Sequence, residues 1–507
     1  MIGPAPAHHT CTLSIIPGAD TMEWQGKYDS LFIGGQWVAP STDELIDVVS
    51  PYTEQSIARV PAGANPDIDN AVAAARRAFD QGSWPRMPLA DRIEAMRRLS
   101  AEMQAAEALM AEVVTAEMGC PITQSRLIQS RRPRLILDAM IDLAQKYPFD
   151  EIREAPSGRA RVTREPVGVL AAIVPWNAPH LVTMMKLAPA LLTGCTVVLK
   201  PSPETPLDAY LLAELISRAG LPDGVVNIVP AHRDPSEYLV THPGVDMVSF
   251  TGSTGAGRQI GALCGGLLRR TALELGGKSA ALVLDDADLE STVDALRAGA
   301  FRNTGQVCSS KTRVVVSHRR ATEFIDALRA ATEAMPVGDP SDPATEFGPL
   351  VSARQREGVE GYIRAGRAEG ATVVLGGGRP TGVDTGWFVE PTIFAGVRPE
   401  MRIAQEEIFG PVLSVLEYDT EDEAIAIAND SAYGLNGAIF TSDPQHAVAL
   451  AEWIRTGTVE INGNPVGLAA PVGGVKDSGL GRELGPEGFD EFIEFKSVGL
   501  PRDLALG

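Results

Sequence analysis

A regular alternation of buried strands and amphipathic helices between residues 167 and 275 limits the possible fold more than any other feature. An apolar run at 167–173 is followed by a helical pattern at 180–193 and by a second apolar run at 195–200. Such alternation predicts a parallel sheet with helices on both faces, a Rossmann-like unit of the dinucleotide-binding class. Further helices are expected at 206–219, 237–241 and 254–262, and further strands at 225–229, 245–250 and 271–275.

A second α/β unit is expected over residues 281–475. A chain of 507 residues is too long for one hydrophobic core, so two or three domains are expected. The 44% hydrophobic and 21% charged residues are typical of a globular protein. Helical periodicity in the second unit covers 286–300, 321–334, 353–369, 421–429 and 444–456.

The N-terminal part has a different pattern. Residues 28–60 read as short strands and turns, with a hairpin at 33–37. Amphipathic helices follow at 67–79, 91–105 and 106–118.

The charge and the cysteines exclude several classes of partner. A net charge of −21 argues against nucleic acid and anionic membranes, which favour basic surfaces. No stretch approaches the roughly 20 apolar residues of a membrane span. The five cysteines are odd in number and form no CxxC pair, so neither a disulfide framework nor a zinc site is indicated and a reducing cytoplasm fits. Residues 1–21 are expected to be a flexible leader, because their apolar run at 13–16 is too short for a signal peptide.

Two segments have the pattern of exposed strands. Residues 158–165 alternate polar and apolar side chains in a ribbon too thin to be stable alone. Residues 492–498 alternate in the same way and are expected to form a half-buried strand. Unpaired strand edges pair with other chains, so these segments predict a homo-oligomer.

Cys308 lies in a polar turn, residues 301–310, between an expected helix and an expected strand. Gly305 allows the backbone to turn there without a Cβ penalty. A cysteine in polar surroundings can become a thiolate, the reactive form, although a small buried hydrophobe is the alternative interpretation. The carboxylate of Glu274, between leucines and a Gly-Gly turn in residues 273–279, favours the reactive interpretation.

The junction at 250–257, F-T-G-S-T-G-A-G, closes a strand and opens a helix. Free N–H groups and the positive end of the helix dipole at such a junction bind phosphate. The glycines are spaced G-x-x-G-x-G, which is not the dinucleotide fingerprint, so a plain helix cap is the alternative. The position after a strand in an alternating unit favours a cofactor. Residues 197–204 follow the second strand, where a Rossmann-type sheet contacts the adenosine ribose.

Four separated motifs together resemble the NAD(P)-dependent aldehyde dehydrogenase superfamily: Pro175-Trp176-Asn177, residues 273–279, the turn around Cys308, and E-E-I-F-G-P at 406–411. They occur in the family's order, and the resemblance runs from about residue 31 to residue 501. It implies a cofactor-binding domain at 22–149 with 168–276, a catalytic domain at 277–480, and a small β oligomerisation arm at 150–167 with 488–503, which would make a dimer or tetramer.

The resemblance also implies a cofactor site. Lys200 would hold ribose hydroxyls and Ser253 the pyrophosphate, while Glu407 and Phe409 would contact the nicotinamide ribose and ring. NAD-preferring members often carry a glutamate three residues after the lysine, whereas this chain has Pro203 there and Glu204 next. NAD is therefore the expected cofactor, with NADP or dual use left open. The remaining expected contacts are Trp176, Ser202, Gly252 and Gly276.

The implied chemistry is the oxidation of an aldehyde to its carboxylic acid. The Cys308 thiolate would form a thiohemiacetal and then a thioester, with the oxyanion held by Asn177 and the Cys308 N–H. Glu274 would be the general base for hydrolysis, assisted by a proton relay through Lys186. From the residues alone, Asn177 would be read as a turn residue, and the polar edge of the helix at 180–193 is nearly as good an interpretation of Lys186 as the relay.

The substrate is less constrained. Ala178 and Gly467 stand where relatives often carry bulky aromatic residues, which suggests space for a large or hydrophobic aldehyde. Arg302 points either inward to an anionic substrate or, more in keeping with its charge, outward to solvent. Two alternatives are a CoA-acylating semialdehyde dehydrogenase and a catalytically silent binding protein. Glu274 argues against the first, because acylating relatives tend to lack this base. The presence of Cys308, Glu274 and Asn177 together argues against the second. The expected mouth residues are Ala178, Val182, Met185, Arg302, Val307, Ser309 and Gly467.

Overall fold

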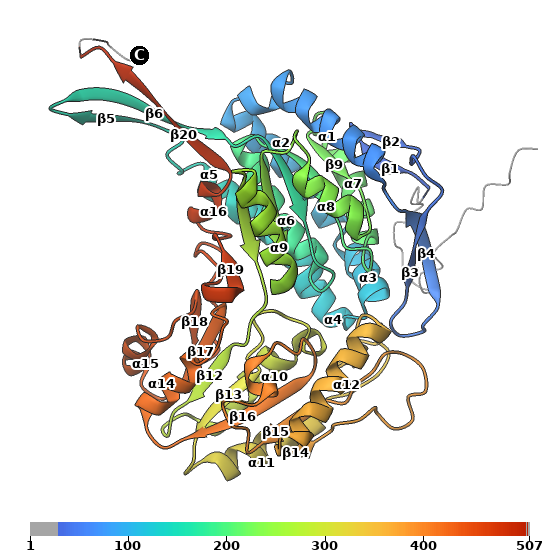
Figure 1. The fold of residues 1–507 in the computed structure, drawn as a ribbon, viewed down its shortest axis with the longest axis vertical. Helices are drawn as coiled ribbons and strands as arrows, with labels where there is room; N and C mark the ends of the chain where they lie inside the picture. Colours follow the sequence, from blue (N-terminus) through green and yellow to red (C-terminus); the bar gives the residue numbers. More distant parts are fainter. Residues whose placement is uncertain (1–28, 503, 505–507) are drawn as a thin grey trace, which may run out of the picture.

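The computed structural model describes residues 29–502 and 504, so the leader expected at 1–21 lies outside the described residues. An eight-stranded sheet and a seven-stranded sheet, each covered by helices, form the upper and lower parts of Figure 1, and a ribbon projects from the upper part. The expected α/β class, with two sheet units and a small β arm, is confirmed.

The eight-stranded sheet has a parallel centre. Its order is β19 (Gly479–Leu480), β11 (Arg270–Glu274), β10 (Met247–Thr251), β7 (Val169–Ile173), β8 (Thr196–Lys200), β9 (Val226–Ile228), β1 (Leu31–Ile33) and β2 (Gln36–Val38). Strands β11, β10, β7, β8 and β9 run parallel, and the predicted hairpin β1–β2 and the short β19 are antiparallel at the edges. The strand order reverses between β7 and β10, and dinucleotides bind at the carboxyl ends of strands at such a point.

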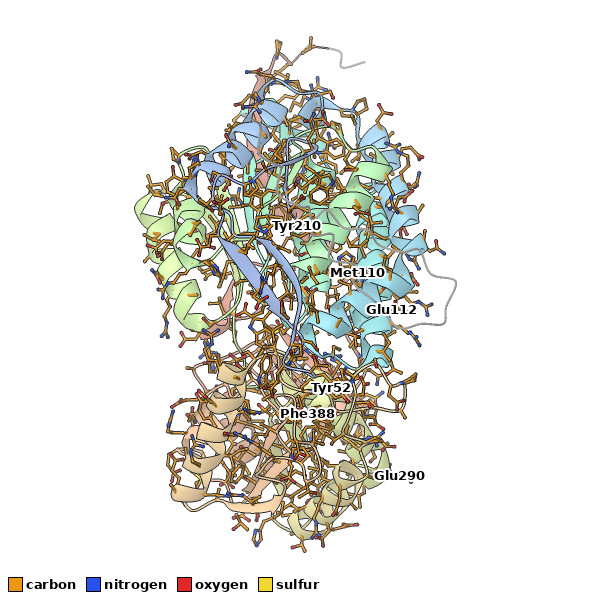
Figure 2. The ribbon with its side chains drawn as sticks, turned by 90° about the vertical axis from the view of Figure 1, so that its right-hand side faces the viewer. Tyr52, Met110, Glu112, Tyr210, Glu290 and Phe388 are labelled. Carbon is orange, nitrogen blue, oxygen red and sulfur yellow. The ribbon has the colours of Figure 1, made fainter. Side chains whose placement is uncertain are left out.

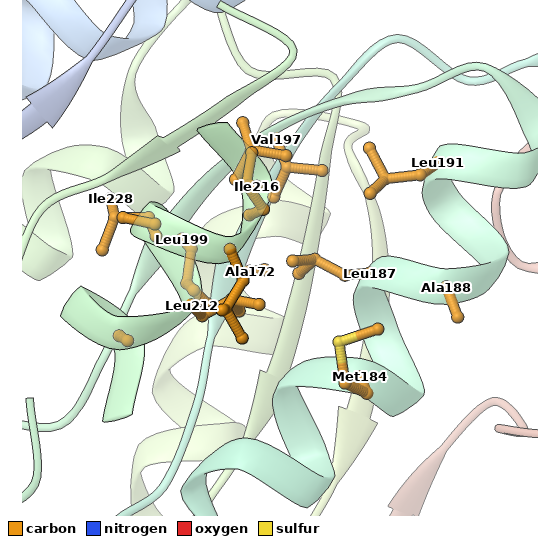
Figure 3. Close-up of a cluster of buried hydrophobic side chains, with 14 of the residues drawn as sticks. Ala172, Met184, Leu187, Ala188, Leu191, Val197, Leu199, Leu212, Ile216 and Ile228 are labelled. Atoms are coloured by element: carbon orange, nitrogen blue, oxygen red, sulfur yellow. The ribbon is translucent and has the colours of Figure 1, made fainter. Parts of the chain in front are cut away.

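Helices cover both faces of this sheet, as the alternation predicts. One face carries α6 (Pro179–Thr193) and α7 (Leu207–Ala219), with α2 (Leu89–Ala105), α3 (Glu107–Met118) and α5 (Arg132–Ala144) packed around them. Figure 3 shows part of this core, including Leu187 of α6, Val197 of β8 and Ile216 of α7. The other face carries α1 (Asn65–Asp80), α8 (Arg233–Thr241) and α9 (Thr254–Gly266).

The sequence pattern did not predict the helical segment before the arm. It comprises α4 (Ile122–Gln124), a π-helical stretch (Ser125–Arg131) and α5. Four arginines and Pro133 interrupt the apolar periodicity there. Pro133 is the second residue of α5, which directly follows the π-helical stretch, so it has no N–H to donate within this continuous helical segment. π-Helical turns are frequent at functional sites, and this one contacts the cavity described below.

The seven-stranded sheet has the order β14 (Thr372–Leu375), β15 (Thr392–Ala395), β16 (Val412–Tyr418), β13 (Arg313–Ser317), β12 (Ala280–Val283), β17 (Asn436–Phe440) and β18 (Thr458–Ile461). All neighbours are parallel except β14 and β15. Its helices are α10 (Leu289–Phe301), α11 (Ala321–Glu333), α12 (Ala353–Ala368), α13 (Arg402–Gln405), α14 (Glu421–Asn429) and α15 (Pro444–Ala451). The helix predicted at 444–456 therefore ends early, at Ala451.

The hairpin of β3 (Leu45–Val49) and β4 (Ser56–Pro61) links the upper and lower parts. Tyr52 in its turn meets Phe388 edge-on, with ring centroids 6.2 Å apart, and Figure 2 shows the pair at the junction. Glu54 of the same turn accepts a hydrogen bond from the Gly386 N–H at 2.9 Å. The two parts are thus joined on this side by direct contacts.

The projecting ribbon consists of β5 (Asp150–Ala155), β6 (Gly158–Pro166) and β20 (Ile493–Leu500), in the antiparallel order β20-β6-β5. β6 and β20 were predicted, whereas the charged sequence of β5 concealed it. The prediction that the C-terminal strand is half-buried is wrong for the single chain, because Phe495 is 58% and Val498 45% exposed. A three-stranded ribbon has no second layer to cover them.

Candidate active site

A cavity of about 1210 Å³ lies where the carboxyl ends of β7, β8, β10 and β11 face the seven-stranded unit. All the predicted site residues except Lys186 line it, although they come from both sheet units. They are Cys308, Glu274, Asn177, Trp176, Lys200, Ser202, Gly252, Ser253, Gly276, Glu407 and Phe409.

A left-handed turn brings Cys308 into this cavity. After α10 ends, Asn303, Thr304 and Gly305 take φ values of 50°, 56° and 74°, and the first two are unfavourable for residues with a Cβ. Hydrogen bonds hold the turn: the Asn303 N–H donates to Gln124 Oε1 at 2.7 Å, and Thr304 Oγ1 donates to the Gly348 carbonyl at 3.0 Å. The sequence pointed only to Gly305.

Asn177 is fixed to the same turn. Its side-chain Nδ2 donates to the backbone carbonyl of Gln306 at 2.9 Å. The backbone carbonyl of Asn177 accepts hydrogen bonds from Asn303 Nδ2 and from Gln129 Nε2, both at 3.1 Å. Because an amide nitrogen carries two hydrogens, one remains for a ligand. Asn177 is therefore part of the frame around Cys308 and not merely a turn residue.

The Cys308 thiol is held in its neutral form. Burial, followed by the charges of Glu407 and Glu274, raises its pKa to about 12. The expectation that polar surroundings favour the thiolate is wrong in its reason, since Gln306 and Ser310 are buried and the charges of Glu407 and Glu274 have a larger effect on the sulfur than that of Arg302. A proton acceptor or a bound positive charge is needed to activate the sulfur.

Glu274 and Lys186 are connected through a third residue that the sequence did not identify. Burial, followed by the charge of Glu483, raises the pKa of Glu274 well above its usual range. Lys186 Nζ donates to Glu483 Oε1 at 2.8 Å and to Ser249 Oγ at 3.0 Å, and Lys186 is fully buried. The surface interpretation of Lys186 is thus wrong. No periodicity or motif marks Glu483, which follows a Gly-Arg pair in a loop.

The phosphate end of the cavity is built from strand ends and the start of α9. Ser253 is the N-cap of α9, with its Oγ accepting from the Ala256 N–H at 3.4 Å. A helix N-terminus after a parallel strand supplies N–H donors to a phosphate. Burial lowers the pKa of Lys200 to about 8, and Ser202 Oγ donates to Glu204 at 2.5 Å. This wall suits the adenosine half of a dinucleotide.

The nicotinamide end depends on close backbone approach. Glu407 Oε1 accepts from the Gly277 N–H at 3.0 Å, and burial raises the pKa of Glu407 to about 7. A Cβ at Gly276 would overlap the Glu407 carboxylate, so any larger residue there would push this carboxylate out of its place. The rings of Trp176 and Phe409 meet edge-on at 5.3 Å, with Phe409 at a φ of 56°. In this arrangement, Glu407 is suited to contact a ribose, and the rings of Trp176 and Phe409 are suited to pack beside a flat ring.

The substrate end is mainly apolar. Of the predicted mouth residues, Gly467 does not line the cavity, and Pro465 and Val466 of the same loop line it instead. Arg302 lines the cavity wall, so the interpretation that it points to solvent is wrong. The other expected mouth residues lie on the wall: Ala178, Val182, Met185, Val307 and Ser309.

The comparisons with known proteins agree with this geometry. The model of the aldehyde dehydrogenase family matches residues 37–498. The chain belongs to the aldehyde dehydrogenase family. It is 46% identical to geranial dehydrogenase of Castellaniella defragrans, over 93% of this chain and 98% of that protein. It is 42% identical to betaine aldehyde dehydrogenase of Rhizobium leguminosarum, over 92% and 96%.

A solved structure supports the same assignment. The aldehyde dehydrogenase of Mycobacterium tuberculosis, crystallised with NAD⁺, is 45% identical and superposes with a TM-score of 0.93, covering 94% of this chain and 99% of that one. The predicted family, fold and enzyme class are confirmed: an aldehyde dehydrogenase is an oxidoreductase that converts an aldehyde to an acid. Among residues 29–502 and 504, no helix is long and apolar enough to cross a membrane.

The electrostatics of Cys308 give a first prediction. At pH 8 Glu407 is ionised, and its charge disfavours the thiolate. Replacing Glu407 with Gln lowers the pKa of Cys308, so iodoacetamide should alkylate Cys308 about threefold to tenfold faster in the cofactor-free protein, one pKa unit being a factor of ten. Peptide mass spectrometry measures the rate. Glu406→Gln, an adjacent carboxylate paired with Arg402, is the control; an unchanged or slower rate in Glu407→Gln would refute this electrostatic account.

Proposed function

We propose that this aldehyde dehydrogenase is an NAD-dependent, hydrolytic enzyme that works through Cys308. The observation that carries the proposal is that Cys308, Asn177 and Glu274 line one cavity with the strand ends and helix N-terminus that suit a dinucleotide. A catalytically silent binding protein would not need these three groups together.

In the acylation step, Cys308 forms the thioester, and Asn177 and the Cys308 N–H stabilise the oxyanion. The thiol proton leaves first, to solvent, so this step does not require Glu274. The sulfur adds to the aldehyde carbon, giving a thiohemiacetal oxyanion that accepts hydrogen bonds from Asn177 Nδ2 and the Cys308 N–H. When bound beside this carbon, NAD⁺ supplies the hydride acceptor. The oxyanion then collapses to a carbonyl, the hydride departs, and a thioester remains on Cys308.

Glu274 has the deacylation role. A carboxylate with a raised pKa is a good general base near neutral pH, so Glu274 takes a proton from the water that attacks the thioester. The acid product leaves and the Cys308 sulfur is released. The proton passes from Glu274 toward the buried Glu483–Lys186 pair, which is the candidate relay.

The CoA-acylating alternative differs only in the acyl acceptor. Hydrolysis needs a base beside the thioester, and Glu274 supplies one. We expect NADH formation from NAD⁺ and an aldehyde at full rate without CoA. Measuring NADH absorbance with and without CoA tests the proposal, and strict dependence on CoA would contradict it.

Glu204 gives the second prediction, for cofactor choice. Its carboxylate is held by Ser202 on the cavity wall near Lys200, where it would accept a ribose hydroxyl and repel a 2′-phosphate. NAD should therefore be preferred over NADP. Replacing Glu204 with Gln should raise kcat/KM for NADP about tenfold by removing the like charge. Kinetics with both cofactors measures the change, and an unaltered ratio would refute the role of Glu204.

The division of the chain and its assembly are part of the proposal. We assign cofactor binding to 22–149 with 168–276, catalysis to 277–480, and assembly to the arm at 150–167 with 488–503. Exposed Phe495 and Val498 on the arm support a homo-oligomer, dimer or tetramer, since a second chain would cover them. Analytical ultracentrifugation tests this. The four described cysteines are all free, which suits a reducing cytoplasm.

A further inference from the structure

Two arginines stand in the substrate end of the cavity. Arg302 begins the left-handed turn that leads to Cys308, and Arg132 begins α5. Both line the cavity, together with apolar side chains such as Ile128, Val182 and Val466. The proposed chemistry at the aldehyde carbon uses neither arginine.

Neither guanidinium has a hydrogen-bond or ion-pair partner among the residues that the structure describes. The two groups lie close enough to act on each other: burial first, and then the charge of Arg132, lowers the pKa of Arg302. Two like charges on a partly buried wall destabilise the protein unless an anion compensates them.

The carboxylate whose charge acts on Arg302 is already engaged. Glu460 pairs with Lys311 at 2.7 Å and also accepts from Asn436 Nδ2 at 2.9 Å. Its charge favours the charged form of Arg302, but Lys311 offsets it. Arg302 therefore faces the like charge of Arg132, and the opposing charge of Glu460 is already paired with Lys311, so positive charge at this end of the cavity is not fully compensated although the chain as a whole is acidic.

We propose that the physiological aldehyde carries a carboxylate at the end opposite its carbonyl, and that Arg302 and Arg132 bind this carboxylate. The proposal rests on the function proposed above and names its substrate class: an aliphatic oxo-acid. Guanidinium groups bind carboxylates through paired N–H donors, and the apolar wall accommodates the intervening methylenes. Aldehydes with a quaternary ammonium group, such as betaine aldehyde, would be repelled, although some relatives are named for that substrate.

The test compares a series of ω-oxo carboxylic acids with neutral n-alkanals of the same length and with betaine aldehyde. For at least one chain length, kcat/KM for the oxo-acid should exceed that for the alkanal by about tenfold or more, as expected for charge-assisted pairing. Betaine aldehyde should be the poorest substrate. Replacing Arg302 with Gln should lower the acid-to-alkanal ratio at least about tenfold, and Arg302→Lys should lower it less.

Arg131→Gln is the matched control, because Arg131 precedes Arg132 directly and is exposed to solvent. It removes the same charge and should leave the ratio unchanged. If Arg302→Gln fails to fold, as judged by its melting temperature, Arg132→Gln gives the same comparison. Competitive inhibition of the unaltered enzyme by saturated dicarboxylates, against the oxo-acid, is a further readout that needs no variant.

Several outcomes would overturn the proposal. One such outcome is equal or faster turnover of alkanals at every chain length. The others are a preference for betaine aldehyde and an unchanged acid-to-alkanal ratio of kcat/KM in the arginine variants. Each would show that no anion subsite operates, while leaving the proposed dehydrogenase function intact. Failure of every aldehyde to reduce NAD⁺ would overturn the proposed function as well. The two failures are therefore distinguishable in one set of assays.

Discussion

Replacing Cys308 with Ser lowers kcat by roughly 10⁴-fold or more, the scale of loss when a covalent nucleophile is removed. A hydroxyl ionises far less readily than a thiol, and the surroundings of Cys308 already disfavour the anion through burial and two carboxylates. NADH formation in the steady state measures the loss.

The control for this variant is Cys195→Ala. Cys195 is buried beside β8 and does not line the cavity, so its loss should change stability slightly and leave kcat unchanged. Thermal melting separates a folding defect from a chemical one. A Cys308→Ser protein with a normal melting temperature and more than a tenth of the original kcat would contradict the nucleophilic role.

Replacing Glu274 with Gln should block hydrolysis while leaving the thioester able to form. The expected loss in kcat is about 10²–10⁴-fold, the typical contribution of a general base. A burst of NADH close to one equivalent per active site should precede the slow steady state, because acylation outruns deacylation. Stopped-flow absorbance measures the burst.

Two outcomes separate the roles of Glu274. A full burst with slow turnover places Glu274 in deacylation. The absence of a burst, with a protein that still binds NAD⁺, would mean that removal of the thiol proton depends on Glu274 alone. Retention of the original kcat would contradict its role as the base. Glu491→Gln is the control, since Glu491 is a neighbouring acid whose charge also acts on Glu274 but which does not line the cavity.

The fold was largely predictable because strand-helix alternation is a local signal. The segments that form β7, β8 and β10 are short, continuous apolar runs separated by helices. Such runs are buried on both faces, which favours parallel strands covered by helices. The segment 122–144 was missed because its arginines and Pro133 hide the helical period. β5 was missed because a charged, exposed strand has no apolar alternation.

The members of the site were predictable, but its electrostatics were not. Motifs identified Cys308, Glu274 and Asn177, yet the pKa of Cys308 depends on carboxylates that only folding brings near it. Glu483 was invisible for the same reason, because its link to Lys186 joins distant parts of the chain. The direction of Arg302 depends on the left-handed turn at Asn303 and Thr304. Asn tolerates a positive φ, but the β-branched Thr disfavours it, so the residue types did not predict this turn.

The most direct test of the central claim is to identify the covalent intermediate. Glu274→Gln protein is mixed with NAD⁺ and hexanal, quenched in acid, digested and analysed by mass spectrometry. The account predicts one acyl group per chain on the peptide that contains Cys308, with the mass of hexanal less two hydrogen atoms, and an equal amount of NADH. An acyl group on another cysteine, or NADH formed without any adduct on Cys308, would contradict it.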